Sequence, residues 1–256
     1  YGPAIFDALT TVADAVSAKK HMRELNKSGI RVIIRVPDNY SDKNIYNAVF
    51  INDGDVICNN GFKDFMYPGC ILIGLVPENR LDEYTPWQER AIRKGAADFG
   101  GRCDEYHTKL TQQIVPWAAG EYNINRDTLA YGGYSLGGLA AVYSLFRDDT
   151  FANIFSVCGS FWYPGFTEYI SSTPVVNRNA YVRLINGENE GSRHGNILEE
   201  APARAHYVHE YLSHIMNVCG SVDEYGHHEH HAERIKCALE DVLKHIDAND
   251  SGNTIL

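Results

Sequence analysis

The stretch Gly133-Tyr134-Ser135-Leu136-Gly137-Gly138 decides the fold of this chain, because it sets a serine between two glycines at a strand-to-helix junction. Residues 128–134 (TLAYGGY) are β-branched, aromatic and small, as in a short buried strand. Apolar residues then recur at helical spacing over 136–146. Glycine on both sides lets the strand and helix backbones pass at a sharp turn that exposes the serine. The pattern predicts a nucleophile at Ser135.

Short apolar runs and helical patterns alternate on both sides of this junction. The apolar runs predict strands at 30–36, 46–52, 70–76, 128–134, 154–158 and 181–186, with a short one at 221–225. Helical spacing predicts helices at 87–98, 104–117, 136–146, 203–216 and 231–246. Nearly continuous apolar strands between helices indicate an α/β protein with a mostly parallel sheet covered on both faces. The first two predicted strands, at 30–36 and 46–52, are expected to run antiparallel to each other at the start of the sheet.

Length and composition bound the organisation of the chain. Its 256 residues, 44% of them hydrophobic, are enough for one large core, so we expect a single domain over 1–256. Residues 1–29 are predicted to be an N-terminal extension, in which the pattern of 3–25 suits either a helix or a strand. Residues 247–256 (DANDSGNTIL) are predicted to be a frayed tail.

Charge and cysteine usage narrow the partners. The net charge of −10 and the absence of a Lys/Arg cluster argue against nucleic acid and against an anionic membrane surface. No apolar run is long enough to span a membrane. Six scattered cysteines without a C-x-x-C motif suit a reducing compartment, so a cytoplasmic location is expected. A small-molecule substrate fits this composition, and a homo-oligomer is compatible with it.

Two segments downstream of Ser135 can complete a catalytic triad, whose acid and histidine follow the serine on loops at the carboxyl edge of the sheet. The first is Gly187-Glu188-Asn189-Glu190-Gly191, after the strand at 181–186. A carboxylate there can accept the Nδ1–H of a histidine and stabilise the imidazolium. The residues alone leave Glu188 and Glu190 as alternatives.

The second segment is Gly226-His227-His228-Glu229-His230-His231, just before the last predicted helix. A neutral imidazole is an efficient general base at neutral pH. If the apolar face of that helix packs on the core, the base lies just before the helix begins, which favours His230, with His228 as the alternative. His227 and His231 are spaced as metal ligands can be, but H-E-x-x-H is absent, so no metal is expected. No organic cofactor is required either.

An oxyanion hole needs two backbone N–H groups near the nucleophile. The N–H of Leu136, at the start of the helix after Ser135, is the first. The second is expected from Asp53-Gly54-Asp55, which follows the strand at 46–52. There Gly54 permits the turn that lets the N–H of Asp55 face the site.

With these residues assembled, the chain resembles the esterase D-like branch of the α/β hydrolases, which includes enterochelin-type siderophore esterases and bacterial feruloyl esterase domains. The resemblance covers about 30–245. Residues 30–40 and 46–55 look like the family's first strand and its oxyanion loop. Residues 73–87 are similar to its R-x-x-E-Y-x-P segment, and 112–143 to the helix and strand that lead into the nucleophile. Residues 158–163 (CGSFWY) follow.

The resemblance implies an α/β-hydrolase fold and a serine carboxylic-ester hydrolase that works through an acyl-enzyme. The family's acid sits at the fourth position of a G-x-x-[DE] loop, which is Glu190, and its histidine precedes the last helix, which again selects His230. The family's usual Gly-Gly-His or Gly-x-x-His opening is replaced here by a run of histidines.

The sequence predicts the type of reaction more precisely than the identity of the substrate. Trp162 stands where such esterases often carry an aromatic residue near the site. Arg80 and Arg90 can meet an anionic ligand such as a ferric catecholate, and Tyr84 and Trp162 can hold an aromatic acyl group. A siderophore-like trilactone, a feruloyl ester and a small generic ester are therefore all candidate substrates. Acyl transfer in the same fold is an alternative, and a non-catalytic ligand-binding domain is the alternative from another class.

Overall fold

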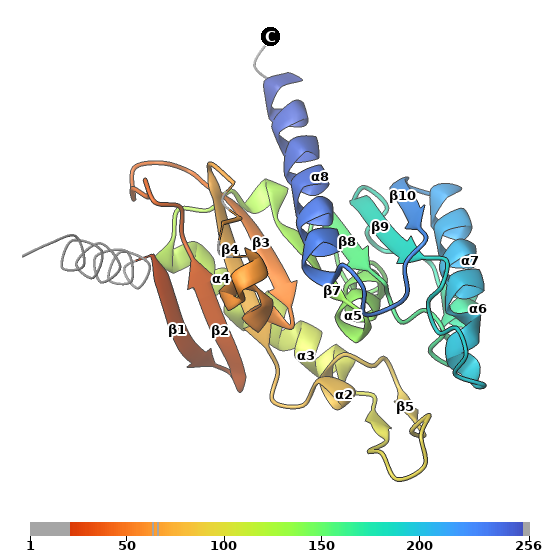
Figure 1. The fold of residues 1–256 in the computed structure, drawn as a ribbon. Helices are drawn as coiled ribbons and strands as arrows, with labels where there is room; N and C mark the ends of the chain where they lie inside the picture. Colours follow the sequence, from red (N-terminus) through yellow and green to blue (C-terminus); the bar gives the residue numbers. More distant parts are fainter. Residues whose placement is uncertain (1–20, 63, 66, 253–256) are drawn as a thin grey trace, which may run out of the picture.

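The fold is organised around one large sheet in the computed structural model, which describes residues 21–252 except 63 and 66 (Figure 1). Most of the expected N-terminal extension (1–20) and the last four residues lie outside the described residues. The eight strands run in the order β1-β2-β4-β3-β7-β8-β9-β10. Their bounds are Met22–Lys27 (β1), Ile30–Arg35 (β2), Asn47–Asn52 (β3), Cys70–Val76 (β4), Ala130–Tyr134 (β7), Asn153–Val157 (β8), Tyr181–Gly187 (β9) and Asn217–Asp223 (β10).

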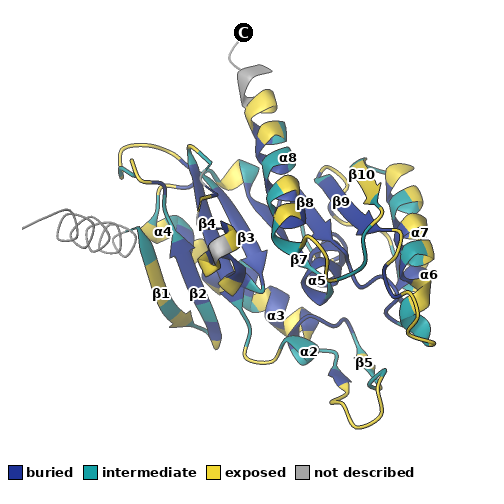
Figure 2. Cartoon of the chain, viewed as in Figure 1, coloured by how far each residue is buried: buried dark blue, intermediate teal, exposed yellow. Residues whose placement is uncertain are grey.

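The sheet is parallel from β4 to β10, and only its first two strands break the pattern. β1 pairs antiparallel with β2, and β2 pairs antiparallel with β4. An antiparallel start is therefore present. However, the predicted strands at 30–36 and 46–52, which correspond to β2 and β3, do not pair with each other, because β4 lies between them. β3 and β7 are buried along most of their length because helices cover both faces of the sheet (Figure 2).

Two hydrophobic cores lie on opposite faces of the sheet. The larger one packs α3 (Cys103–Lys109), α4 (Val115–Glu121), α5 (Leu136–Ser144), α6 (Phe166–Ser172) and α7 (Ala201–Ser213). The smaller one packs α8 (His231–Gly252) against β7, β8 and β9. Two 3₁₀ segments, Gly54–Cys58 (η1) and Asn60–Phe62 (η2), complete that face. Two more 3₁₀ turns occupy Arg126–Thr128 and Ile197–Glu200.

The predicted helix at 104–117 is interrupted. A π turn at Leu110–Ile114 separates α3 from α4, just ahead of Pro116. Proline has no backbone N–H to donate, and a wider turn before it relieves the lost hydrogen bond. The chain still runs on as one helical segment through Glu121.

The predicted helix at 87–98 is wrong. A short helix, α2 (Arg80–Glu83), precedes this region, and the region itself carries a two-stranded ribbon of β5 (Gln88–Glu89) and β6 (Phe99–Gly100). Gly95 has a φ of 84°, which a helix does not tolerate. Trp87 is anchored outside the segment, because its indole N–H donates to the Pro164 carbonyl at 3.0 Å.

The last strand and the last helix are both longer than the sequence predicted. β10 begins at Asn217, four residues before the predicted strand, and α8 continues through Gly252. Residues 247–252 are thus helical where a frayed tail was expected. None of the helices in the described part of the chain is long and apolar enough to cross a membrane.

Candidate active site

Ser135 sits on the turn between β7 and α5, in a backbone conformation that the surroundings impose. Its φ of 56° and ψ of −121° lie outside the regions that non-glycine residues normally adopt. A Cβ at Gly133 or at Gly137 would lie 2.8 Å from the Cβ of Asn52, so only glycine fits at either position. The predicted turn around the serine is therefore confirmed in its geometry.

The side chain of Asn52, at the end of β3, holds this turn in place through hydrogen bonds. Its amide donates to the Gly137 carbonyl at 2.9 Å and to the Tyr131 hydroxyl at 2.8 Å, and its oxygen accepts from the Tyr106 hydroxyl at 2.7 Å. The Asn52 side chain is buried and fully engaged, which holds the start of α5 against the end of β3.

His227 is the histidine that reaches the serine. Its Nε2 lies 3.0 Å from Ser135 Oγ, and its Nδ1 lies 2.8 Å from Glu190 Oε2. The buried Glu190 also accepts from the backbone N–H of Gly187 at 2.7 Å. Because a carboxylate only accepts, Nδ1 carries the proton and Nε2 is free to accept the hydroxyl proton of Ser135.

The expectation that His230 meets the serine is wrong. His230 has a φ of 51°, and its ring lies 4.2 Å from the Tyr225 ring, away from Ser135. The turn at 227–230 reverses the chain before α8, so the first histidine of the run faces the nucleophile. The Tyr134 hydroxyl donates to the His227 carbonyl and helps to fix this turn.

His228, the alternative base, lines the cavity beside the serine, but it has no hydrogen bond to Ser135 within the described residues. Burial and the neighbouring His227 lower the pKa of His228. Burial likewise lowers the pKa of His231, whose ring packs on Tyr134. His228 and His231 therefore favour the uncharged form, which limits their repulsion of a proton on His227.

Arg234, on the first turns of α8, ties the histidine loop to the sheet. Its guanidinium bonds to the Asp223 carboxylate through two nitrogens, donates to the Gly226 carbonyl at 2.9 Å and contacts Cys158 Sγ at 3.1 Å. The ends of β8 and β10 and the residue before His227 thus share one buried cation. Sequence reasoning missed this residue.

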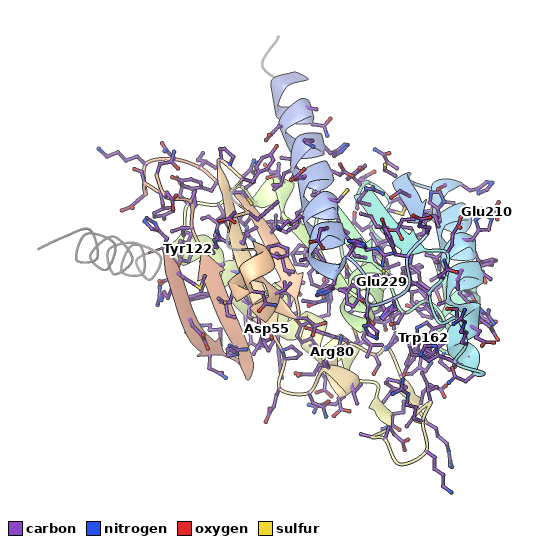
Figure 3. The ribbon with its side chains drawn as sticks, viewed as in Figure 1. Asp55, Arg80, Tyr122, Trp162, Glu210 and Glu229 are labelled. Carbon is purple, nitrogen blue, oxygen red and sulfur yellow. The ribbon has the colours of Figure 1, made fainter. Side chains whose placement is uncertain are left out.

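Of the three residues predicted for the oxyanion hole, Leu136 lines the cavity beside Ser135, whereas Gly54 and Asp55 do not. Leu136 lines the cavity and begins α5, so its N–H lies at the positive end of the helix. Gly54 packs on β4, since a Cβ there would come within 2.2 Å of the Gly74 backbone. Asp55 is exposed and does not line the cavity, and in Figure 3 it lies on the side of Arg80 away from Trp162. A role for the Asp55 N–H stays a prediction.

The cavity beside Ser135 has a volume of about 390 Å³ and is both aromatic and cationic. Arg80 and Trp162 line it as predicted, and Figure 3 labels both. Tyr84 does not: it is fully buried, accepts from the Asp53 N–H and donates to the Leu75 carbonyl. The cavity is also lined by residues that the sequence did not indicate, namely Ile92, Arg93, Phe99, Asn189, Gly191, Ser192, His194, Leu198 and Ala201.

The positive charge of Arg80 is paired with the carboxylate of Asp53. It binds both Asp53 oxygens, at 2.9 and 2.8 Å. Burial opposes its charge, but the hydrogen bonds that it donates to Asp53 prevail and the pKa of Arg80 is raised. Arg93 lies on the exposed ribbon loop, whereas Arg90, the other predicted cation, does not line the cavity.

Within the described part of the chain, the group of side chains spaced to hold a metal ion includes the Glu190 and His227 of the hydrogen-bond chain. The ligand atoms of Cys158, Glu190 and His227 lie within 4.8 Å of one another. However, Nδ1 of His227 and the Glu190 carboxylate already bond to each other. Burial, and next the charge of Glu190, raise the pKa of Cys158, which disfavours the thiolate that binds metals. This set therefore fits a hydrogen-bonded relay better than a metal site.

The fold and the site define an α/β hydrolase. They combine a mostly parallel sheet, a serine on a strained strand-to-helix turn, and a histidine and a glutamate that bond to each other from later loops. Residues 24–229 match the family model described as putative esterase, and the chain belongs to this family. The predicted fold class and the resemblance to esterases are confirmed.

The chain is also similar to a sequence relative and, in its fold, to solved structures. The chain is 29% identical over 239 residues to YbbA of Bacillus subtilis (strain 168), described as uncharacterised, which covers 87% of the chain and 96% of that protein. An IroE-like serine hydrolase from Shewanella oneidensis superposes with a TM-score of 0.68 at 16% identity, covering 88% of this chain and 78% of the other. The siderophore hydrolase EstA from Aspergillus nidulans superposes with a TM-score of 0.68 at 15% identity, covering 87% and 94%.

Proposed function

We propose that the protein hydrolyses carboxylic esters through an acyl-enzyme on Ser135, with His227 as general base and Glu190 as its orienting acid. The observation that carries the proposal is the unbroken hydrogen-bond chain from Ser135 Oγ through both ring nitrogens of His227 to Glu190. The chain ends on a strained serine at the positive end of a buried helix. That is the arrangement that activates a serine.

The steps follow from these positions. Ser135 Oγ attacks the ester carbon while its proton passes to Nε2 of His227, and Glu190 stabilises the imidazolium that forms. The oxyanion is met by the N–H of Leu136, at the positive end of α5. His227 returns the proton to the leaving alkoxide. It then deprotonates a water molecule, which attacks the acyl-enzyme and releases the acid and free Ser135.

Three substitutions test the assignment with p-nitrophenyl acetate. Ser135→Ala and His227→Ala should each lower kcat by roughly 10³-fold or more. His230→Ala is the matched control, three residues along the same loop, and should change kcat less than about threefold. Greater loss in His230→Ala than in His227→Ala would overturn the assignment of the base.

Covalent labelling separates catalysis from simple ligand binding. A fluorophosphonate should attach to Ser135 in the wild type, because only an activated serine reacts. The reagent should fail to attach in His227→Ala, where the serine has lost its base. An unlabelled wild-type protein would favour a non-catalytic binding domain. Product analysis with a competing alcohol distinguishes hydrolysis from acyl transfer.

For the substrate we propose an aromatic ester, of which a siderophore trilactone, anionic as its ferric catecholate, is the leading example and an uncharged feruloyl ester the second. Support comes from the cavity, where Trp162 and Phe99 lie 6.3 Å apart between ring centroids. Arg93 supplies positive charge there, whereas the charge of Arg80 is paired with Asp53. The name of EstA describes that protein as a siderophore hydrolase, and its fold is shared.

The exposed arginines of the ribbon provide a matched test of this substrate class. Arg93→Ala should raise KM for a ferric catecholate trilactone several-fold and leave KM for uncharged p-nitrophenyl acetate unchanged. Arg90→Ala removes the same charge three residues away, outside the cavity, and should leave both values near wild type. Equal effects of the two substitutions would indicate only long-range attraction.

A further inference from the structure

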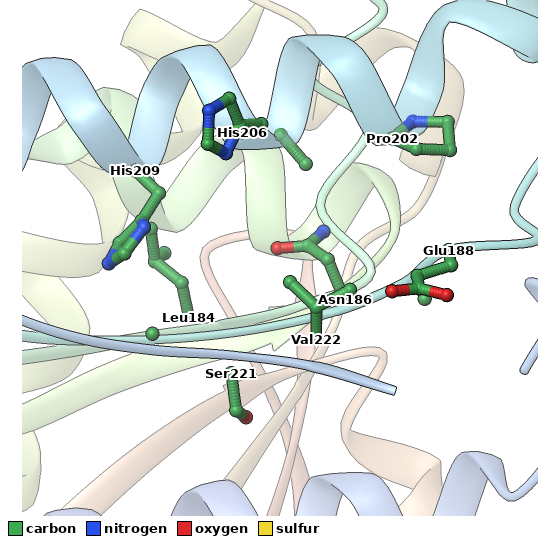
Figure 4. A pocket seen from close by; sticks show the side chains of 11 residues that line it. Leu184, Asn186, Glu188, Pro202, His206, His209, Ser221 and Val222 are labelled. Carbon is green, nitrogen blue, oxygen red and sulfur yellow. The ribbon is translucent and has the colours of Figure 1, made fainter. Parts of the chain in front are cut away.

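A second cavity, of about 460 Å³, lies between α7 and the last two strands of the sheet (Figure 4). It is separated from the active-site cavity by the loop after β9. Glu188 and Pro202 line the second cavity, whereas their neighbours Glu190 and Ala201 line the first. Its volume falls in the range of small-molecule sites, about 300–1,000 Å³. The proposed hydrolysis uses none of its side chains.

Small residues hollow out this space. Ala205 and Pro202 face it from α7, and Gly220 faces it from β10. A Cβ at Gly220 would lie 2.5 Å from Nε2 of His209, so the missing side chain lets the His209 ring lie against the strand. Apolar walls come from Leu184 of β9 and from Val222. Val222 is 62% exposed, so the cavity opens at the edge of the sheet.

Asn186 supplies the polar feature of the cavity. Asn186 is a buried residue, and Figure 4 shows its amide directed into the space beneath α7. No described side chain or backbone group bonds to this amide, and its atoms are not among the fully buried polar atoms that lack a partner, so they are accessible from the cavity. By contrast, buried Asn177 donates to the Phe151 carbonyl at 2.7 Å. The Asn186 amide can therefore donate to, and accept from, a polar group of a ligand that enters the cavity.

The other polar groups define the charge of that ligand. The carboxylate of Glu188 stands at one end of the cavity, and its lining includes no lysine or arginine from the described part of the chain. The rings of His206 and His209 lie along the α7 side (Figure 4). An anion would meet the carboxylate without a compensating cation, whereas a flat ring can lie between the imidazoles and the apolar strand surface.

We propose that this cavity is a second small-molecule site, which takes an uncharged or cationic ring compound whose amide or hydroxyl group bonds to Asn186. The ring fills the space between α7 and the strand side chains. The amide of Asn186 donates one hydrogen bond and accepts another, as a primary amide or phenol requires. This proposal is independent of the ester hydrolysis proposed above.

Three probes with one ring test the proposal by ¹H–¹⁵N NMR titration of the full chain: benzamide, benzamidine and benzoate. Benzamide and benzamidine should shift the amide signals of Ala205 and Gly220 with a Kd of roughly 1 mM, a value suited to so small a ligand. Benzoate should bind at least tenfold more weakly. Shifts confined to Gly191 and Leu198, beside Ser135, or equal binding of benzoate, would overturn the proposal.

Asn186→Leu keeps the volume and removes the amide. It should weaken benzamide binding at least tenfold and leave the Tm equal or higher, since no protein hydrogen bond is lost. Asn177→Leu, the matched control, should lower the Tm. Ala205→Met fills the cavity from α7 and should abolish binding, which keeps the test decisive if Asn186→Leu folds poorly. Unchanged benzamide affinity in both cavity variants would refute the site.

Discussion

Arg234 offers a sharp test of how His227, the proposed general base, is held in place. Replacement by methionine keeps the length of the side chain and removes its contacts with Asp223, Gly226 and Cys158. Breaking a buried ion pair costs about 3–5 kcal/mol, and the lower end applies because the Asp223 side chain is 28% exposed. A loss of about 3 kcal/mol corresponds to a fall in Tm of roughly 6–12 °C in a chain of this size.

The catalytic effect follows from the position of Gly226, directly before His227. Without the bond to its carbonyl, the loop can move and the His227 ring loses its alignment with Ser135. We expect Arg234→Met to lower kcat for p-nitrophenyl acetate roughly tenfold at 25 °C, which corresponds to about 1.4 kcal/mol in the barrier.

Arg183→Met is the matched control. Arg183 is also buried and also bonds to a carboxylate, Asp241 of α8, at 2.7 Å, but it does not contact the histidine loop. Its replacement should lower the Tm by a similar amount and leave kcat within about twofold. The reasoning is refuted if Arg234→Met keeps wild-type kcat, or if Arg183→Met loses as much activity at equal stability.

Two further predictions concern stability. Burial raises the pKa of Asp148, but the hydrogen bond and charge of His107, 2.8 Å away, outweigh it and lower the pKa to about 2. The contribution of the ionised carboxylate is therefore complete above pH 4 and lost as the pH falls through about 2. Urea titrations should show Asp148→Asn less stable than wild type by about 1 kcal/mol at pH 5, after discounting for solvent screening, and no less stable near pH 2. Gly54→Ala should destabilise by about 3 kcal/mol in denaturant melts, because its Cβ overlaps the Gly74 backbone, whereas Gly120→Ala, with open space around it in α4, should stabilise by about 0.5–1 kcal/mol. Equal effects of the two alanines would contradict the packing argument.

The sequence predicts those parts of the site that local rules determine. The serine turn is recognisable because glycine spacing, strand and helix lie within about 20 residues. Glu190 is recognisable because its loop directly follows a clear strand, although choosing it over Glu188 needed the family resemblance. The alternation of apolar runs and helices was enough to predict the parallel sheet and its two helical layers.

The remaining parts depend on contacts between distant segments. His227 was missed because the left-handed residue at His230 and the bond from Tyr134 decide which imidazole turns inward. The glycine directly before His227 was the available signal, since the related esterases place glycine before their histidine. The ribbon at 88–100 was missed because its partner strands are two residues long and leave no periodicity.

The contacts of Asn52 bear on how this family can vary in sequence. Two glycines of the serine turn, Gly133 and Gly137, press on the same Cβ, and the amide beyond it bonds to the Gly137 carbonyl. A larger residue at either glycine would require a smaller one at position 52, which would forfeit the amide. These three positions should therefore covary among relatives, and a double substitution should be less damaging than the sum of its single substitutions.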